Sequence, residues 1–269
     1  MRFGTRSRVA AMDARALACA GGCRTRGREA RTNRRERRRA GAQAGIAAAV
    51  TLAGVNGDSF AALAAQPDAP LDRLALAMAA EFGPVHVSGA LAELDRLAAG
   101  IAPRGAAPPD HVDALREILG RREGFRGDRE HYDDPDNSML DVVLARRRGL
   151  PIALSVVYVE VARRAGIALR GIGLPGHYVV GHFGSVPPLL LDPFNGGAPL
   201  EWAAPVDIRP WSVHETVLRM LNNLVGSYLR RADLTRAIRA AELRLELPIS
   251  EPQRHALTTE LNSLRAVLN

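Results

Sequence analysis

A histidine and an aspartate are the side chains of this sequence best suited to acid–base chemistry, because their spacing predicts that they meet. His177 begins the β-like stretch HYVVGHF, and Asp192 lies near the end of the next one, PLLLDPF. If the turn between the two stretches centres near Gly184 and Ser185, antiparallel pairing places His177 opposite Asp192, with Cβ atoms about 5 Å apart. An imidazole held by a carboxylate can serve as the base of a nucleophilic site.

The third group of such a site would lie at the start of a buried helix. The segment PIALSVVYVEVARRAGI is apolar nearly all round, Pro151 suits its first helical position and Gly166 suits its end. The next β-like stretch runs back along this helix, so the helix start should return to the vicinity of His177. A Cys–His–Asp triad has this arrangement, with the thiol pKa lowered by the helix N-terminus, but Pro151 offers no nucleophilic atom.

Each of these residues also has an interpretation that needs no chemistry. His177 follows the Pro175-Gly176 turn at a strand end, and Asp192 is well placed to cap the turn at Pro193. Ser155 lies one turn inside the helix on the face of Pro151 and is the other conceivable nucleophile, with a place in the cleft. Packing, or hydrogen bonding to the helix backbone, is the role expected of a serine at such a position.

Apolar periodicity surrounds this site with helices and an antiparallel sheet, which predicts an α+β fold. We expect an N-terminal helical bundle at 57–122, a core with an antiparallel sheet packed on the buried helix at 123–205, and a helical region at 206–269. The predicted helices are 71–82, 88–101, 108–121, 139–148, 151–165, 214–233, 234–248 and 251–267, and the predicted strands are 168–174, 177–183 and 188–194.

Two local predictions rest on spacing within these elements. Ser138 and Asp141 match a capping box at the start of helix 139–148. The helices of 214–248 have the spacing of a tetratricopeptide unit, a hairpin that cannot bury its own apolar face and should pack on the rest of the chain or on a partner. The residues that carry this spacing are Leu224, Tyr228, Ala237 and Pro248.

Residues 1–56 are expected to form a basic, disordered leader. Residues 1–45 carry a net charge of +10 and the remainder carries −3, with Arg as the only basic residue type apart from His. The Arg-rich stretch 24–39 could contact nucleic-acid phosphates, although it has no aromatic side chain for base stacking. Both cysteines, Cys19 and Cys23, lie in this leader, so no disulfide is expected in the folded part. That usage fits a reducing, cytoplasmic compartment.

Other classes of protein fit the sequence less well. The stretch GIAAAVTLAGV offers export as an alternative location, but it follows an unusually long n-region, and no run reaches the roughly 20 apolar residues of a membrane helix. The acidic segment DPDNSMLD lacks the Gly and Glu that an EF-hand calcium loop requires. His177 and His182 should face opposite sides of a strand, so we expect no metal. No phosphate-loop or dinucleotide-binding motif appears in the sequence, and we expect no cofactor.

Three segments of the sequence resemble a known family. The segments NSMLDVVLARRRGLPIALSVVYVEVARRAGI, GIGLPGHYVV and LLLDPFNGG resemble bacterial transglutaminase-like proteins of the SirB type, over roughly residues 58–248. The resemblance implies a transglutaminase-like, papain-like core joined to tetratricopeptide-type helices. It places His177 and Asp192 at the second and third triad positions and Pro151 where the active superfamily has cysteine. SirB-type proteins commonly have Gly-Ile-Pro there, and the resemblance implies no established substrate or cofactor.

The same resemblance points to further cleft residues. Asn137, Ser138 and Asp141 belong to the motif of this subfamily and are expected to line the cleft, although Asn137 and Ser138 also suit a capping role at a helix start. His131 and Tyr132 lie in the loop before them and could contact a ligand, or simply be an exposed loop pair.

Three functions follow from these observations. The first is a transglutaminase-like protein without the catalytic cysteine, with a regulatory or protein-binding role and an unknown protein or small-molecule partner. The second is a cysteine-independent hydrolase or transferase that uses His177 and Asp192, with water as one conceivable nucleophile. The third is a nucleic-acid-associated protein that works through its Arg-rich leader.

Overall fold

A computed structural model describes residues 59–103, 105–201 and 208–268 of the chain. The leader predicted at 1–56, with its Arg-rich stretch and both cysteines, lies outside the described residues. The helices are α2 Phe60–Ala64, α3 Leu71–Ala80, α4 Val87–Ala99, α5 Pro108–Leu115, α6 Leu140–Arg146, α7 Pro151–Arg164, α8 Val213–Arg230, α9 Leu234–Glu246 and α10 Glu251–Leu268. The strands are β1 Arg126–Gly127, β2 Arg148–Gly149, β3 Leu169–Leu174, β4 His177–His182, β5 Leu189–Asp192 and β6 Ala198–Leu200. The shorter turns are η1 Arg116–Arg122, η2 Pro135–Ser138 and η3 Pro193–Asn195.

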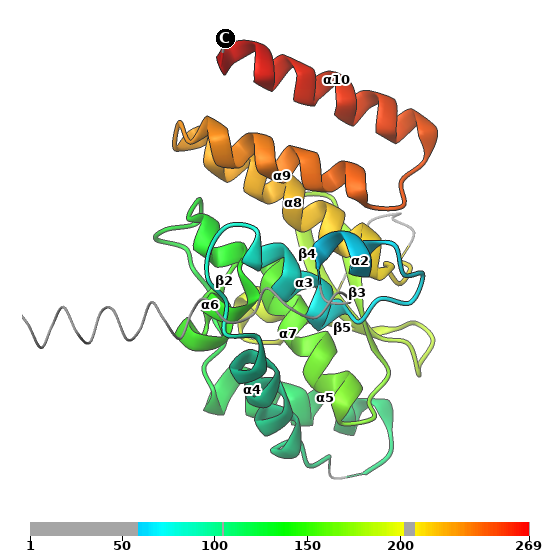
Figure 1. Cartoon of the computed structure of the whole chain (residues 1–269). Helices are drawn as coiled ribbons and strands as arrows, with labels where there is room; N and C mark the ends of the chain where they lie inside the picture. The colour runs from blue at the N-terminus through cyan, green and yellow to red at the C-terminus, as the bar shows by residue number, and fades with distance from the viewer. Residues whose placement is uncertain (1–58, 104, 202–207, 269) are drawn as a thin grey trace, which may run out of the picture. The chain divides into compact units, whose positions relative to one another are not determined.

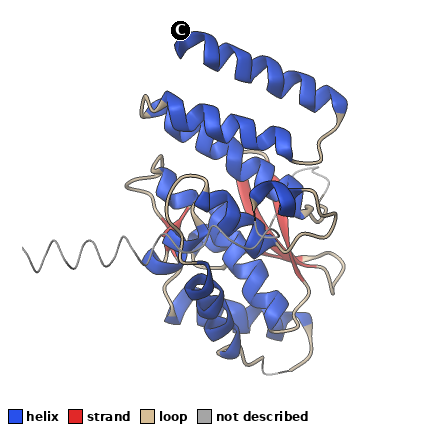
Figure 2. Cartoon of the chain, in the orientation of Figure 1, coloured by secondary structure: helices blue, strands red, loops and turns tan. Residues whose placement is uncertain are grey.

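Helix α7 is the centre of the fold, as its all-round apolar pattern predicts. Every residue from Pro151 to Ala162 is buried, including Glu160 and Ser155. Strands β3 and β4 pack against it, and so do α3, α4, α6 and α8. Figure 1 shows α7 surrounded by these elements, and Figure 2 shows the small sheet beside it. A mixed helix-and-sheet fold with an antiparallel sheet on a buried helix is therefore confirmed.

The sheet has the order β3-β4-β5-β6, with all neighbours antiparallel. Strand β6 and the short parallel pair β1–β2 were not predicted. The predicted register between β4 and β5 is also wrong by two residues, because Val180 pairs with Leu191 and His182 with Leu189. Pro187 and Pro188 have no N–H to donate to the ladder, so both stay in the turn and its centre moves towards the C-terminus.

Another prediction that needs correction is the single helix at 108–121. Regular α5 ends at Leu115, and the chain continues to Arg122 as a π-helix. Gly120 of this π-turn packs against the backbone of Gly196, where a Cβ atom would lie 2.0 Å from the Gly196 carbonyl oxygen. The wider turn thus brings the backbone after α5 against η3, next to Asp192.

An ion network fixes the far end of α7, with Asp72 and Glu160 buried and Asp95 exposed. Arg164 binds Asp72 of α3 at 2.5 Å, Glu160 at 2.7 Å and Asp95 of α4 at 2.7 Å. Burial raises the pKa of Glu160, and the nearby charge of Asp72 adds to that effect, whereas the arginines oppose it. The network ties the N-terminal helices to α7, and their apolar side chains join the same hydrophobic cluster as those of α7 and α8.

The C-terminal helices stack on one another. Helix α8 starts with a capping box between Ser212 and Glu215 and packs along α9, and α10 packs on the outer side of α9. Figure 1 shows this succession from α8 (yellow) through α9 (orange) to α10 (red). No helix in the described part of the chain is long and apolar enough to cross a membrane. The tetratricopeptide assignment of the α8–α9 hairpin stays a prediction, as does the division into three regions.

Candidate functional site

His177 and Asp192 form a direct pair. The Nε2 atom of His177 lies 3.0 Å from Oδ2 of Asp192, and the two side chains are 26% and 7% exposed. An ionised carboxylate can only accept, so Nε2 carries the proton and donates it. In a neutral imidazole the other nitrogen, Nδ1, is then the basic one. His177 and Asp192 are paired as the sequence predicts, but they are not register partners in the β4–β5 ladder.

Asp192 is held by more than its histidine. Its Oδ1 accepts hydrogen bonds from the backbone N–H groups of Phe194 (2.9 Å) and Asn195 (3.3 Å), and its Oδ2 accepts one from the Asn195 amide (2.7 Å). Burial acts to raise the pKa of Asp192, but the hydrogen bonds and charge of His177 and Asn195 outweigh it, so the pKa lies below its ordinary value. Asp192 thus caps η3 and also binds His177. The turn-capping role and the pairing role that the sequence offers for this residue are therefore compatible.

Aromatic side chains pack beside the His177–Asp192 pair. The Phe194 ring lies edge-on to His177, with centroids 6.4 Å apart, and edge-on to Tyr132 at 6.0 Å. The guanidinium of Arg129 lies over the Phe194 ring at 5.2 Å and donates to the Asn195 side chain at 2.5 Å. Tyr132 is therefore joined to the site through Phe194.

The start of α7 carries no nucleophile. Leu150 and Pro151 form its first turn, and the Leu150 N–H donates to the Asn137 carbonyl at 2.9 Å. Ser155 is buried and donates its hydroxyl to the Pro151 carbonyl at 2.8 Å, the backbone hydrogen bond expected of a serine inside a helix. Helix α7 packs on both β4 and η3, the elements that carry His177 and Asp192.

The segment from Asn137 to Asp141 does not form the predicted capping box. Ser138 ends the 3-10 turn η2, and Met139 precedes α6 without a side-chain cap. The amide of Asn137 donates to the His131 carbonyl at 2.7 Å, which ties the loop to η2. Within the described residues, Asn137 Oδ1, Ser138 Oγ and Asp141 Oδ1 are buried and have no hydrogen-bond partner. The prediction fails because η2 already satisfies the backbone there, with the Met139 N–H donating to the Asp136 carbonyl.

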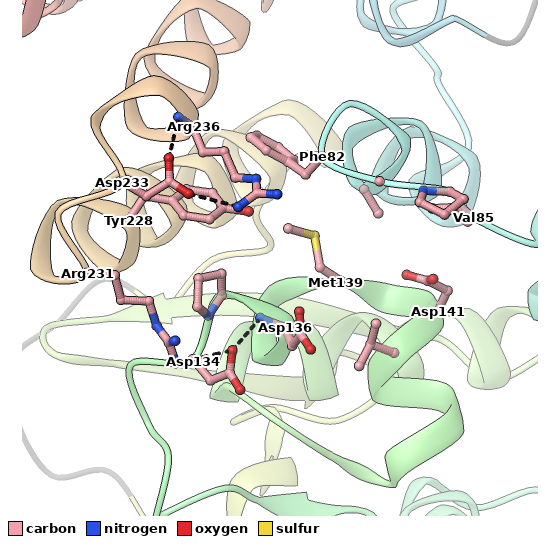
Figure 3. Close-up of a pocket in the computed structure, with 15 residues that line it drawn as sticks. Phe82, Val85, Asp134, Asp136, Met139, Asp141, Tyr228, Arg231, Asp233 and Arg236 are labelled. Carbon is pink, nitrogen blue, oxygen red and sulfur yellow. Dashed lines mark hydrogen bonds and ion pairs between the residues drawn. The ribbon is translucent and has the colours of Figure 1, made fainter. Parts of the chain in front are cut away.

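Asp141 lines a pocket of about 490 Å³ that does not include His177 or Asp192. Figure 3 shows this pocket between Phe82 and Val85 on one side, Asp134, Asp136 and Met139 on another, and Tyr228 with Arg236 on a third. Burial raises the pKa of Asp141 and the charge of Asp136 adds to the effect, which outweighs the lowering by hydrogen bonds from the backbone N–H groups of Val142 and Asp141. The predicted cleft residues thus do not share one pocket.

His131 lines a second pocket, of about 570 Å³, beside η3. Phe194 and Asn195 form part of its wall, which connects it directly to the Asp192 cluster. Asn137 and Ser138 are fully buried between the loop and α7 and line neither pocket. In the described ranges no three His, Cys, Asp or Glu side chains are grouped so that they could hold a metal ion.

Sequence reasoning missed several residues of this site. Phe194, Asn195 and Arg129 complete the surroundings of the pair, and the signal for Asn195 was its place in a turn three residues after a capping aspartate. Tyr158 lies within the apolar run of α7, where the sequence pattern gives no signal for a role of its hydroxyl. Its hydroxyl is buried and has no hydrogen-bond partner among the described residues, and burial, with the charge of Asp192, raises its pKa.

Comparison with known proteins finds relatives that match about half of this chain or less. A UPF0162 protein of Xylella fastidiosa is 36% identical over 165 residues, which cover 54% of this chain and 58% of that protein. A UPF0162 protein of Vibrio cholerae is 28% identical over 156 residues, covering 52% and 58%. The F-box only protein 21 of Homo sapiens is 33% identical over 69 residues, which cover 26% of this chain and 11% of that protein.

The matched region of this chain thus covers less than two thirds of the length of these curated relatives. No solved structure matches the chain. Residues 88–222 match the family model described as the transglutaminase-like superfamily. That match spans half of the sequence and contains the paired histidine and aspartate together with the whole of α7. The chain therefore belongs to the transglutaminase-like superfamily.

Proposed function

We propose that this chain is a transglutaminase-like protein that lacks the catalytic cysteine and acts by binding a partner or ligand, in a regulatory role. The observation that carries the proposal is an intact His177–Asp192 pair, 3.0 Å apart, beside a helix that starts with Leu150 and Pro151. Acyl transfer of the usual kind needs a thiolate at that helix start. Proline has neither a nucleophilic atom nor an N–H to stabilise a developing oxyanion.

The nearby hydroxyl groups do not replace the thiol. Ser155 is 1% exposed and its proton is committed to the Pro151 carbonyl. Ser138 is also fully buried. A substrate carbonyl would have to enter the packed interior around α7 to reach either one, whereas His177 is one-quarter exposed. The exposed imidazole and the neighbouring pocket are therefore better suited to recognising a group than to forming an acyl-enzyme.

Finer features of the family resemblance belong to the same proposal. We infer that the chain is of the SirB type and that the α8–α9 hairpin, with its tetratricopeptide-like spacing, supplies a surface for a protein partner. A cytoplasmic location fits this role, since both cysteines of the sequence lie before residue 24.

An acyl-transfer assay tests the proposal. The full chain is incubated with a glutamine-containing peptide and a primary amine, and separately with an activated ester, while ammonia, alcohol and covalent protein adducts are measured. We expect no turnover above the uncatalysed rate and no adduct. Turnover that disappears in both His177→Ala and Asp192→Asn would overturn the proposal. Binding of a captured partner should survive His177→Ala unless that partner occupies the cleft.

One observation favours the second candidate function, a cysteine-independent hydrolase. Because Nε2 of His177 is committed to Asp192, Nδ1 is the basic nitrogen, and it has no hydrogen-bond partner among the described residues. An imidazole so placed can take a proton from water. The activated-ester arm of the assay detects this activity directly.

A further inference from the structure

The pocket beside η3 is rich in arginine. It measures about 570 Å³, and its lining includes Arg126, Arg129 and Arg148 together with the amide of Asn195. Arginine side chains present several N–H donors in a fixed plane that matches carboxylate and phosphate oxygens. The position of the pocket next to the Asp192 cluster makes its ligand chemistry relevant to the whole site.

Two of the arginines are held side by side by the backbone. Strands β1 and β2 are parallel, and Arg126 is the register partner of Arg148. The pairing is fixed by hydrogen bonds from the Arg126 N–H to the Arg147 carbonyl (3.1 Å) and from the Asp128 N–H to the Gly149 carbonyl (3.2 Å). Register partners on adjacent strands lie about 5 Å apart and extend to the same face. Like charges carried by neighbouring side chains on one face repel each other.

No carboxylate in the described part of the chain forms an ion pair with either guanidinium group, although Asp128 and Glu130 line the same pocket. Neither Arg126 nor Arg148 forms an ion pair or a side-chain hydrogen bond with a described residue. The carboxylate of Asp128 is occupied in the turn that follows, where it accepts from the backbone N–H groups of Glu130 and His131. Glu130 also lines the pocket but is exposed.

Arg129, the third arginine of this pocket, has a structural role. Arg129 lies over the Phe194 ring and donates to the Asn195 oxygen, and Asn195 in turn donates to Asp192. It therefore orders the wall between the pocket and the His177–Asp192 pair. Gly127 lets this wall close, because a Cβ atom there would lie 2.2 Å from the Phe194 ring.

We propose that Arg126 and Arg148 bind the anionic group, a carboxylate or a phosphate, of a small ligand in this pocket. The anion relieves the repulsion between the two guanidinium groups and accepts their N–H donors. The remainder of the ligand lies along Phe194 and Asn195, next to the His177–Asp192 pair. The proposal goes beyond the proposed function by naming ligand chemistry, and it holds whether or not the pair turns a substrate over.

Calorimetric titration of the full chain with inorganic phosphate, citrate and acetate, at constant ionic strength set with chloride, tests the site. We expect saturable binding of phosphate or citrate, and which of the two binds tells whether phosphate or carboxylate ligands are preferred. Arg126→Gln and Arg148→Gln should each weaken binding by about tenfold, the loss of one charge-assisted interaction. Arg170→Gln is the matched control, since Arg170 is an exposed strand arginine that donates only to the Leu169 carbonyl.

A further variant separates binding from folding. Arg126→Glu places opposite charges in register, so it should raise the midpoint of thermal unfolding in chloride while abolishing anion binding. The proposal is overturned if the wild-type chain binds none of the three anions more tightly than about 10 mM. It is overturned equally if binding is unchanged in Arg126→Gln and Arg148→Gln, or is weakened as much by Arg170→Gln.

Discussion

Two regions of this protein differ in whether their buried polar side chains have hydrogen-bond partners. Around Asp192, both carboxylate oxygens accept hydrogen bonds, from His177, from the Asn195 amide and from two backbone N–H groups. Between Asn137 and Asp141, three side-chain oxygen atoms are buried without a hydrogen-bond partner among the described residues. The first region is a completed network, and the second carries a desolvation cost within the chain.

This difference predicts where the fold resists rearrangement and where rearrangement is favoured. A satisfied carboxylate network holds one geometry, because any movement breaks several hydrogen bonds together. A buried oxygen without a partner favours any rearrangement, or any bound donor, that satisfies it. We therefore expect substitutions in the two regions to change the free energy of unfolding with opposite signs.

Asp192→Ala should have the largest effect. It leaves the Asn195 amide, His177 Nε2 and two backbone N–H groups without their acceptor, and we expect a loss of about 3 kcal/mol in the free energy of unfolding. Urea denaturation followed by circular dichroism measures it. Asp192→Asn keeps an oxygen for the backbone N–H groups and should lose less than Asp192→Ala. An equal loss in the two variants would show that the caps of η3 do not contribute.

The pH dependence of stability sharpens the comparison, because the two aspartates have pKa shifts of opposite sign. The pKa of Asp192 is lowered in the folded state, so its contribution is present above the unfolded pKa of about 4 and is lost as the pH falls through the folded value. The pKa of Asp141 is raised, so stability declines as the pH rises from the unfolded value through the folded one.

Asp141→Asn should therefore be more stable than the wild type at neutral pH, with the difference disappearing at a pH below about 4. Asp192→Asn should be less stable at neutral pH, and its difference should also shrink in acid. Urea denaturation at a series of pH values from acid to neutral measures the stability difference of each variant from the wild type. Curves for the two variants that deviate from the wild type in the same direction would contradict the comparison.

Ser138→Ala should have the smallest effect. The hydroxyl of Ser138 is buried without a partner among the described residues, so its removal relieves a desolvation cost, and we expect a gain of up to about 1 kcal/mol. Ser155→Ala is the matched control, because it removes a buried serine hydroxyl that is hydrogen-bonded. If Ser138→Ala is the more destabilising of the two, Ser138 has a partner that this account omits.

The sequence predicts much of the fold because apolar periodicity and turn residues mark each element separately. Helix α7 is recognised by its apolar run between Pro151 and Gly166, and its observed bounds agree closely. The pairing of His177 with Asp192 also follows from spacing, but the β4–β5 register does not, since it depends on how two prolines fit into one turn. The π-turn after α5 depends on the contact between Gly120 and Gly196, which local pattern cannot reveal.

The surroundings of the pair were harder to predict for the same reason. Arg129, Phe194 and Asn195 come together only after the loop before η2 has folded over η3. Asp141 shares a motif with Asn137 and Ser138, yet it lines a different pocket, because α6 turns its first residues towards α3 and α8. Closeness in the sequence thus indicated one cleft where the fold makes two.

Introducing a thiol at the start of α7 tests most directly our proposal that proline occupies the nucleophile position beside the His177–Asp192 pair. Pro151→Cys is made in the full chain with Cys19→Ser and Cys23→Ser, and the rate of alkylation by iodoacetamide is followed against pH. We predict a thiol pKa below the ordinary value of about 8.5 and slower alkylation at neutral pH when His177→Ala is added. A thiol with an ordinary pKa that is indifferent to His177 would contradict the account.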